Sequence, residues 1–281
     1  MSAKSNIKAK EKLGIIAGSG ALFPLIWNES LNQEYQPVVV SFNSLEQQLD
    51  NGQIIPHLQT TLGKIGEILN FFSLHGVKRL IFAGRIQRPS FTTLSFDAVG
   101  LKWIQKLGIK TFGGDDVLLK GITELLEHEG FQIISPRDFL PNLVLKPGIY
   151  AMALPSEADE QDIIRGQDVL SALSSADVGQ ACIVQEGLVL GVEAIEGTQK
   201  LIERCKDLKP HAKGGVLIKL AKENQSTLVD LPTIGPDTIE EMHMCELNGV
   251  AISANTTQVL NFKRVIELCN KYKIFLKVVK G

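Results

Sequence analysis

The sequence predicts an α/β protein built from two domains. Its 281 residues suggest about two domains at roughly 150 residues each. In the first half, β-branched and aliphatic runs alternate with amphipathic stretches, which is typical of a mostly parallel sheet with helices on its faces. In the second half, a hairpin signal appears among the helices and strands, which predicts a mixed α/β (α+β) domain. Between the halves, Lys146-Pro147-Gly148 is the best linker candidate.

The N-terminal domain is expected at residues 13–145, after a flexible tail at residues 1–12. Contiguous valines at residues 38–40 favour a strand. Apolar residues between 65 and 72 share one helical face before Gly76, a residue type that commonly ends helices. In chain order, the patterns predict strands at residues 13–17, 37–42, 77–83 and 131–134, and helices at residues 62–75 and from Asp115-Asp116 to Gly130.

The C-terminal domain is expected at residues 146–281 and differs in texture. Ser156 and Asp159 form a candidate capping box at the start of a helix. Glu186-Gly187 separates two apolar runs, which is typical of a hairpin. The patterns predict helices at residues 156–173, after Gly197 and at 236–247, strands at 181–185, 188–194, 215–220, 227–231 and 250–253, and a last helix and strand between 262 and 279.

Charge and cysteine content exclude several classes of protein. The 29 basic and 31 acidic side chains give a formal charge of −2, whereas nucleic-acid-binding domains usually carry a clear basic excess. We therefore expect no nucleic-acid partner. The four cysteines contain no C-x-x-C pair and no histidine at ligand spacing, which argues against a zinc site. Small buried thiols in a reducing compartment are the better interpretation.

The location of the protein is expected to be cytoplasmic. No run of about 20 apolar residues is present, as a spanning helix would need. Lysines in the tail precede an uncharged run at residues 13–27, which superficially resembles a signal peptide. Gly18-Ser19-Gly20 and Pro24 interrupt that run. A buried strand followed by a glycine turn explains it better.

Two turns of the first domain are candidate ligand contacts. Gly18-Ser19-Gly20 directly follows a strand, where glycine lets a phosphate approach the backbone. The dinucleotide fingerprint requires a third glycine where this chain has Phe23, so an NAD site is disfavoured. Arg85 also follows a strand, and an arginine fork matches phosphate oxygens. A merely tight turn and a solvated surface arginine are the alternatives.

The second domain contributes a run of acidic and small residues. Asp177 and Gln180 precede one predicted strand, Glu193 lies near the end of the next one, and Glu196 and Gly197-Thr198 follow it. Two carboxylates three residues apart, followed by a glycine and a helix start, could collect a divalent cation and a phosphate. A strand edge and a capped helix are the alternative.

Asp230 is the most unusual acidic residue. It lies in an apolar segment, where an ionised carboxylate is unfavourable unless it is paired or bound to a metal. The five histidines are scattered, and neither G-x-S-x-G nor a G-x-x-x-x-G-K-[ST] loop occurs. From the residues alone, our interpretation is a metal-dependent enzyme acting on a phosphorylated substrate.

Five motifs resemble those of a known family. They are LGIIAGSGALFP at residues 13–24, AGRIQRP at 83–89, DVGQ at 177–180, VLGVEAIEGT at 189–198 and DLPTIGP at 230–236. Their order and content resemble the LpxI type of UDP-2,3-diacylglucosamine pyrophosphatase, and together they span almost the whole chain. The resemblance implies a Rossmann-like N-terminal domain and a separate C-terminal domain.

The same resemblance implies an enzyme of lipid A synthesis. The enzyme would hydrolyse UDP-2,3-diacylglucosamine to UMP and 2,3-diacylglucosamine 1-phosphate (lipid X). Water would attack the α-phosphorus with the help of Mg²⁺, or of Mn²⁺ as the alternative. A lipid-linked substrate implies peripheral contact with the cytoplasmic face of the inner membrane. A homodimer is one arrangement that the sequence leaves open.

Site residues carried over from the resemblance centre on Asp230. It matches the family's essential aspartate, acting either as a metal ligand or as a general base. Metal contacts are expected from Asp230, Glu193 and Glu196. Substrate contacts are expected from Gly18, Ser19, Gly20, Arg85, Asp177, Gln180, Gly197, Thr198 and Lys219.

Three positions depart from the family pattern. Ser226 and Leu228 replace a carboxylate and an arginine, and Gln199 replaces an aspartate. A non-catalytic protein of the same fold, which binds a nucleotide sugar or lipid, is therefore the alternative. A nucleotide-binding oxidoreductase is disfavoured by the incomplete glycine fingerprint.

Overall fold

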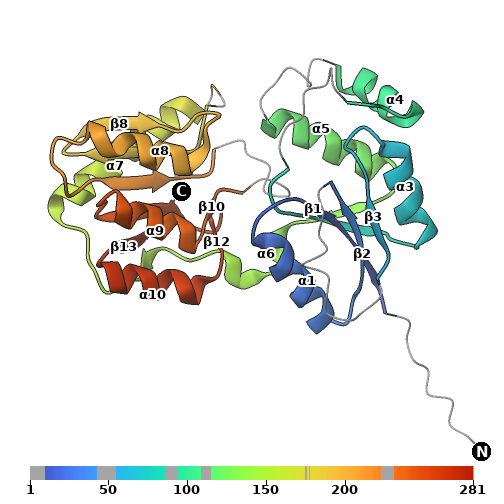
Figure 1. Ribbon diagram of the computed structural model, residues 1–281, viewed down its shortest axis with the longest axis horizontal. Helices are drawn as coiled ribbons and strands as arrows, with labels where there is room; N and C mark the ends of the chain where they lie inside the picture. The colour runs from blue at the N-terminus through green and yellow to red at the C-terminus, as the bar shows by residue number, and fades with distance from the viewer. Residues whose placement is uncertain are drawn as a thin grey trace, which may run out of the picture. The chain divides into compact units, whose positions relative to one another are not determined.

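The chain divides into two compact units between Leu140 and Pro141, whereas the sequence had suggested a division near residue 145. The computed structural model describes residues 10–42, 55–86, 94–108, 115–174, 176, 178–222 and 231–280. Each unit contains a sheet of its own with flanking helices (Figure 1). The prediction of a two-domain α/β protein is confirmed.

The N-terminal unit contains a five-stranded, fully parallel sheet in the order β3-β2-β1-β4-β5. The strands are β1 (Lys12–Ala17), β2 (Gln36–Ser41), β3 (His57–Gln59), β4 (Arg79–Ala83) and β5 (Gln132–Ile134). The helices are α1 (Leu22–Asn32), α3 (Ile65–Leu74), α4 (Ala98–Leu107), α5 (Asp115–His128) and α6 (Pro136–Phe139). All four predicted strands of this unit are confirmed, whereas β3, α1, α4 and α6 were not predicted.

Burial explains why these strands could be recognised. The central strands β1 and β2 are buried along nearly their whole length, as expected for strands covered on both faces. On one face, Phe23 and Ile26 of α1 and Phe139 of α6 pack against Ile15 and Ile81 of the sheet. This packing fixes β1 and β4 as adjacent strands at the centre of the sheet.

The C-terminal unit contains a six-stranded mixed sheet in the order β6-β13-β11-β9-β7-β8. The strands are β6 (Gly148–Ile149), β7 (Ala181–Gln185), β8 (Leu188–Val192), β9 (Val216–Lys219), β11 (Gly249–Ser253) and β13 (Phe275–Val279), and β10 (Thr233–Ile234) pairs separately with β12 (Gln258–Val259). The helices are α7 (Glu157–Ser174), α8 (Gly197–Cys205), α9 (Pro236–Met244) and α10 (Phe262–Tyr272).

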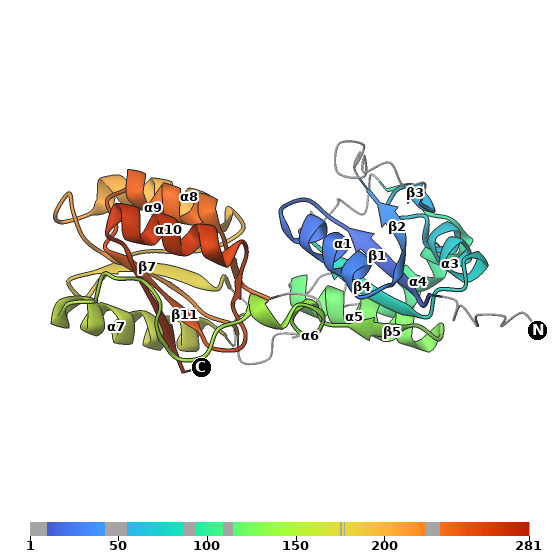
Figure 2. The same ribbon diagram turned by 90° about the horizontal axis from the view of Figure 1, so that it is seen from below.

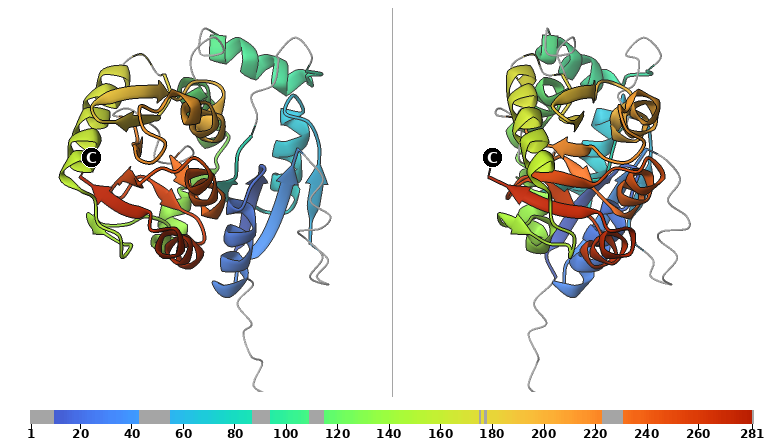
Figure 3. Two further views of the ribbon diagram at one scale, coloured as in Figure 1. Left: turned by 60° about the vertical axis from the view of Figure 1, so that its left-hand side comes forward. Right: turned by 90° about the vertical axis from the view of Figure 1, so that its left-hand side faces the viewer.

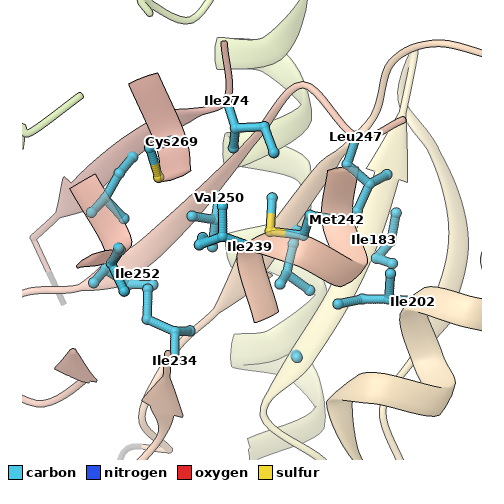
Figure 4. Packing of buried hydrophobic residues seen from close by; sticks show 14 of the residues in the cluster. Ile183, Ile202, Ile234, Ile239, Met242, Leu247, Val250, Ile252, Cys269 and Ile274 are labelled. Carbon is cyan, nitrogen blue, oxygen red and sulfur yellow. The ribbon is translucent and has the colours of Figure 1, made fainter. Parts of the chain in front are cut away.

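This sheet lies between two helical layers. Helices α8, α9 and α10 cover one face and α7 covers the other (Figures 2 and 3). The larger core lies under the three helices, where Ile183, Val250 and Ile252 of the strands meet Ile239 and Met242 of α9 (Figure 4). Because helices cover both faces of the sheet, polar side chains can be exposed at the ends of its strands.

Local predictions in this unit were largely correct. Ser156 and Asp159 form the predicted capping box, because the Asp159 N–H donates to the Ser156 hydroxyl at 3.2 Å and the Ser156 N–H donates to the Asp159 carboxylate at 2.9 Å. The hairpin at Glu186-Gly187 is confirmed, and the buried carboxylate of Asp162 on α7 accepts both turn N–H groups. The predicted strand at residues 227–231 lies outside the described residues except for Leu231, which is not in a strand.

The cysteines are buried, as predicted. Cys182, Cys205, Cys245 and Cys269 are free thiols in the C-terminal core. Burial raises the pKa of Cys182 and of Cys269 to about 12. These thiols therefore stay protonated at neutral pH and act as small apolar side chains.

Candidate active site

The first group of candidate residues lies at the carboxyl edge of the N-terminal sheet. The chain changes direction across the sheet between β1 and β4, since β2 and β3 lie on one side and β5 on the other. In open α/β sheets, ligands bind outside the carboxyl ends of the strands at such a switch point. Gly18, Ser19 and Gly20 follow β1 and Arg85 follows β4, so these candidates share one edge.

Backbone hydrogen bonds join the two turns at this edge. The Ser19 N–H donates to the Arg85 carbonyl, and the Arg85 N–H donates to the Ser19 carbonyl, both at 2.9 Å. The Gly18 N–H donates to the Ala83 carbonyl at 3.0 Å. The Ser19 hydroxyl also donates to the Arg85 carbonyl at 3.0 Å. The N–H groups of Gly18 and Ser19 therefore point toward protein carbonyls.

Glycine is needed where the two turns approach each other. A Cβ at Gly18 would lie 2.5 Å from the Arg85 carbonyl oxygen, and one at Gly84 would lie 2.5 Å from the Ser19 carbonyl oxygen. Gly84 also has a φ of +106°, which only glycine adopts readily. Close packing of the two turns thus accounts for Gly18 and Gly84. The exposed residues Ser19, Gly20 and Arg85 form the rim of this edge of the sheet.

The second group lies at the corresponding edge of the C-terminal sheet. Strand β7 runs antiparallel to both β8 and β9. The carboxyl ends of β8 and β9 therefore lie at the same edge as the amino end of β7. Glu193 follows β8, Lys219 ends β9 and Gln180 precedes β7, while α8 starts with Gly197 and Thr198. This strand order assembles candidates that are far apart in the sequence.

A buried ion pair forms the centre of this edge. Nζ of Lys219 lies 3.8 Å from Oε1 of Glu193, and the two residues are only 5% and 6% exposed. The Thr198 hydroxyl donates to Oε1 of Glu193 at 2.6 Å and accepts a short hydrogen bond from the Lys219 ammonium. The Gln180 N–H donates to Oε2 of Glu193 at 3.2 Å. Three predicted site residues thus surround the carboxylate of a fourth, Glu193.

Gly179 allows the chain before β7 to pack against the chain after β8. It has a φ of +56°, and a Cβ there would lie 1.9 Å from the Glu193 carbonyl oxygen. The Glu193 N–H donates to the Ala181 carbonyl at 2.8 Å, which is the last cross-strand bond of the hairpin. Asp177 and Gln180 of this motif were predicted as site residues, and Gly179 was not. A glycine just before a strand was the feature of the sequence that could have indicated it.

Glu196 has different partners from Glu193. Its Oε1 accepts hydrogen bonds from Nε and Nη2 of Arg204 at 3.1 and 2.9 Å, and its Oε2 accepts the Ala194 N–H at 3.1 Å. Its own backbone N–H and the Arg204 guanidinium lower the pKa of the Glu196 carboxyl. The two glutamates therefore have separate cationic partners. Within the described ranges, no three His, Cys, Asp or Glu side chains gather as a metal site.

A hydroxyl cluster at the end of β11 was not predicted. Oγ of Ser253 lies 2.7 Å from Oγ1 of Thr256 and 2.9 Å from Oγ1 of Thr257. It accepts the Ala221 N–H at 3.1 Å, and the Thr257 hydroxyl donates to the Lys219 carbonyl at 3.5 Å. The cluster therefore holds the backbone around the end of β9. Three hydroxyl residues within five positions after a buried strand were the signal that could have revealed it.

Two candidates, Asp177 and Asp230, lie outside the described residues. Leu231, which follows Asp230, is 8% exposed. The carbonyl of Pro232 accepts the Gln258 N–H at 2.8 Å. Ala221 thus bonds to the last residue of β11 and Pro232 bonds to the first residue of β12.

No helix in the described ranges is long and apolar enough to cross a membrane.

Comparison with known proteins assigns the chain to a family. Residues 12–143 match the model of the LpxI N-terminal domain, and residues 146–277 match that of the LpxI C-terminal domain. The UDP-2,3-diacylglucosamine pyrophosphatase LpxI of Caulobacter vibrioides is 33% identical over 272 residues, which cover 94% of this chain and 96% of that protein. The resemblance seen in the five motifs is confirmed, and the chain belongs to the LpxI family.

Proposed function

We propose that this chain hydrolyses UDP-2,3-diacylglucosamine to UMP and 2,3-diacylglucosamine 1-phosphate. The observation that carries this proposal is the similarity to a pyrophosphatase of that name along nearly the full length of both chains. Both family domains are present in order. Water adds to the α-phosphorus, the bond from that phosphorus to the bridging oxygen breaks, and the diacylglucosamine phosphate leaves.

Asp230 is proposed as the catalytic residue, either as the base for the attacking water or as a metal ligand. Lys219 and Thr198, with Gly197 and Gln180 beside them, are proposed to contact the diphosphate. A buried ammonium and a hydroxyl at the start of a helix are suitable groups for phosphate oxygens. Asp177 and the rim formed by Gly18, Ser19, Gly20 and Arg85 are proposed to contact other parts of the substrate.

Mg²⁺, with Mn²⁺ as the alternative, remains part of the proposal. When bound, such an ion offsets phosphate charge and orients water. Among the described carboxylates, Glu196 does not fit a ligand role because Arg204 occupies it. Glu193 fits poorly because the Lys219 ammonium lies beside its carboxylate. The proposed metal site therefore depends on Asp230.

The two acyl chains of this substrate lead to two further proposals. The enzyme is proposed to work in the cytoplasm and to contact the inner membrane from the cytoplasmic face, where a lipid-linked nucleotide sugar is accessible. A homodimer is proposed as the alternative to a monomer, and light scattering distinguishes the two. Flotation with vesicles tests the membrane contact.

The reaction is tested by measuring UMP release from UDP-2,3-diacylglucosamine in ¹⁸O-labelled water. We expect release that EDTA abolishes and Mg²⁺ restores, with the label in UMP. Label in the lipid phosphate would contradict attack at the α-phosphorus, and unchanged release in EDTA would contradict the metal requirement.

The departures at Ser226, Leu228 and Gln199 favour a second candidate function, a non-catalytic protein that binds the same ligand. Gln199 is exposed and its amide donates to Glu203 at 3.3 Å, away from the ion pair. Tight substrate binding without UMP release by the folded chain would favour this candidate over the pyrophosphatase.

A further inference from the structure

Glu193 connects three segments that meet at the carboxyl edge of the C-terminal sheet. Its two carboxylate oxygens accept hydrogen bonds from the Thr198 hydroxyl at the start of α8 and from the Gln180 N–H before β7. The ammonium of Lys219, at the end of β9, lies 3.8 Å from one of these oxygens. A single side chain thereby sets the positions of a cation and a hydroxyl group.

The burial of this pair needs an explanation beyond stability. Glu193 and Lys219 are both more than nine-tenths buried. Removing two charges from water is unfavourable, and a well-packed apolar pair is often as stable or more stable. The pair lies at the carboxyl ends of β8 and β9, and in open α/β sheets ligands bind outside the carboxyl ends of the strands.

The contacts of Glu193 differ from those of a metal ligand. A carboxylate offers about four acceptor positions, and two donors already bond to this one while the Lys219 ammonium lies 3.8 Å from it. A Mg²⁺ ion would have to approach to about 2.1 Å from the same oxygens, next to the Lys219 ammonium. Repulsion between the two cations in a buried site makes that arrangement unfavourable.

We infer that Glu193 is a positioning residue, which holds Lys219 and Thr198 so that they bind a phosphate group of the substrate. The inference depends on the proposed function, because it assigns roles within the same site. Thr198 links the pair: its hydroxyl hydrogen points to Glu193 while its oxygen accepts from Lys219. Loss of the hydroxyl should therefore disturb the ammonium as much as loss of the carboxylate charge does.

Four variants test this inference. Glu193→Gln removes the charge but keeps the shape, Thr198→Val removes the hydroxyl, and Thr198→Ser keeps it. Glu160→Gln is the matched control, because Glu160 on α7 pairs with Lys277 of β13 away from this edge. The readouts are UMP affinity by calorimetry in EDTA, the KM and kcat of UMP release, the Mg²⁺ concentration for half-maximal rate, and the melting temperature.

The expected pattern separates phosphate binding from metal binding. We expect Glu193→Gln and Thr198→Val to weaken UMP binding in EDTA by about tenfold, the loss of one charge-assisted contact, and to raise KM. Thr198→Ser should stay within about threefold of wild type, and Glu160→Gln should leave UMP binding unchanged. The half-maximal Mg²⁺ concentration should not move in Glu193→Gln.

Two results would overturn the inference. A large rise in the half-maximal Mg²⁺ concentration of Glu193→Gln, with UMP binding in EDTA unchanged, would make Glu193 a metal ligand. Equal losses of UMP binding in Glu193→Gln and Glu160→Gln would reduce its role to general stability. If wild type binds UMP but releases none from the substrate, the proposed function fails, while the calorimetric comparison still tests the positioning role.

Discussion

The carboxyl edges of the two sheets are built from different groups, although both carry predicted site residues. At the N-terminal edge, turns after β1 and β4 are joined by reciprocal backbone hydrogen bonds and packed through Gly18 and Gly84. At the C-terminal edge, the buried charges of Glu193 and Lys219 meet through Thr198. A glycine turn after a strand indicates a phosphate contact only where its backbone N–H groups are free to bind the phosphate. The N–H groups of Gly18 and Ser19 donate to protein carbonyls instead.

Because of this difference, substitutions at the two edges should change different properties of the protein. Substitutions at the N-terminal edge should act on stability, because the groups that they disturb hold two turns together. Substitutions at the C-terminal edge should act on the reaction or on ligand binding, and on stability where they leave one buried charge without its partner. Five experiments test this division.

The largest effect is expected from Asp230→Asn, which changes the proposed catalytic residue. Loss of a general base or a metal-binding carboxylate should lower kcat by about 10²–10⁴-fold. Asp237→Asn is the control, because Asp237 is exposed in the first turn of α9. Rates of UMP release and melting temperatures check this. A folded Asp230→Asn enzyme with more than half of the wild-type kcat would remove Asp230 from the reaction.

The next effect is expected from Lys219→Met, which leaves the Glu193 carboxylate buried and unpaired. Breaking a buried pair on one side destabilises proteins by about 3–5 kcal/mol. The double variant Lys219→Met with Glu193→Gln should recover much of this loss, since no unpaired charge remains. Urea unfolding measures both.

Arg85→Met is the comparison at the N-terminal edge. Arg85 is exposed, and such substitutions usually change stability by less than about 0.5 kcal/mol. Equal destabilisation by Arg85→Met and Lys219→Met would show that the two edges do not differ in charge burial.

The sequence predicted the elements better than the contacts between them. Strands buried on both faces, such as β1 and β2, leave contiguous apolar runs that can be recognised locally. Strands of two or three residues, such as β3 and β10, are too short to show a period. Helix α4 was missed although Asp97 precedes it and accepts the Gly100 N–H at 2.7 Å.

The same limit applies to the site. The sequence named Glu193, Thr198 and Lys219, but their meeting depends on the strand order β9-β7-β8, which no local pattern contains. Glu193 and Glu196, three residues apart, were candidates for a shared cation, with a strand edge and a capped helix as the alternative. In the structure, α8 begins directly after Glu196 and places Arg204 within reach of its carboxylate. Each carboxylate therefore has a cationic partner of its own, which spacing along the sequence does not reveal.

A moderate effect is expected from Gly18→Ala at the N-terminal edge. The added Cβ would lie 2.5 to 2.8 Å from backbone atoms of Gly84 and Arg85, which cannot rotate away. Overpacking of this kind destabilises by about 1–3 kcal/mol. Ser19→Ala, which removes a single exposed hydroxyl contact, should cost less than about 1 kcal/mol. Urea unfolding checks both, and a Gly18→Ala protein as stable as wild type would show that the turns are not tightly packed.

A small effect is expected from Glu196→Gln, because its pair with Arg204 is partly exposed and screened by solvent. The folded state lowers the pKa of Glu196 below its ordinary value of 4.5, so the carboxylate stabilises the fold above that pH. This contribution is lost as the pH falls through the lowered pKa. Wild type should exceed Glu196→Gln by at most about 1 kcal/mol at pH 7, and the difference should shrink below pH 4.5 and in high salt. The buried pair responds differently: the loss caused by Lys219→Met should persist in salt, because buried charges are screened much less. Equal salt sensitivity of the two pairs would mean that Glu193 and Lys219 are open to solvent, and the contrast between a buried and an exposed pair at one edge would not hold.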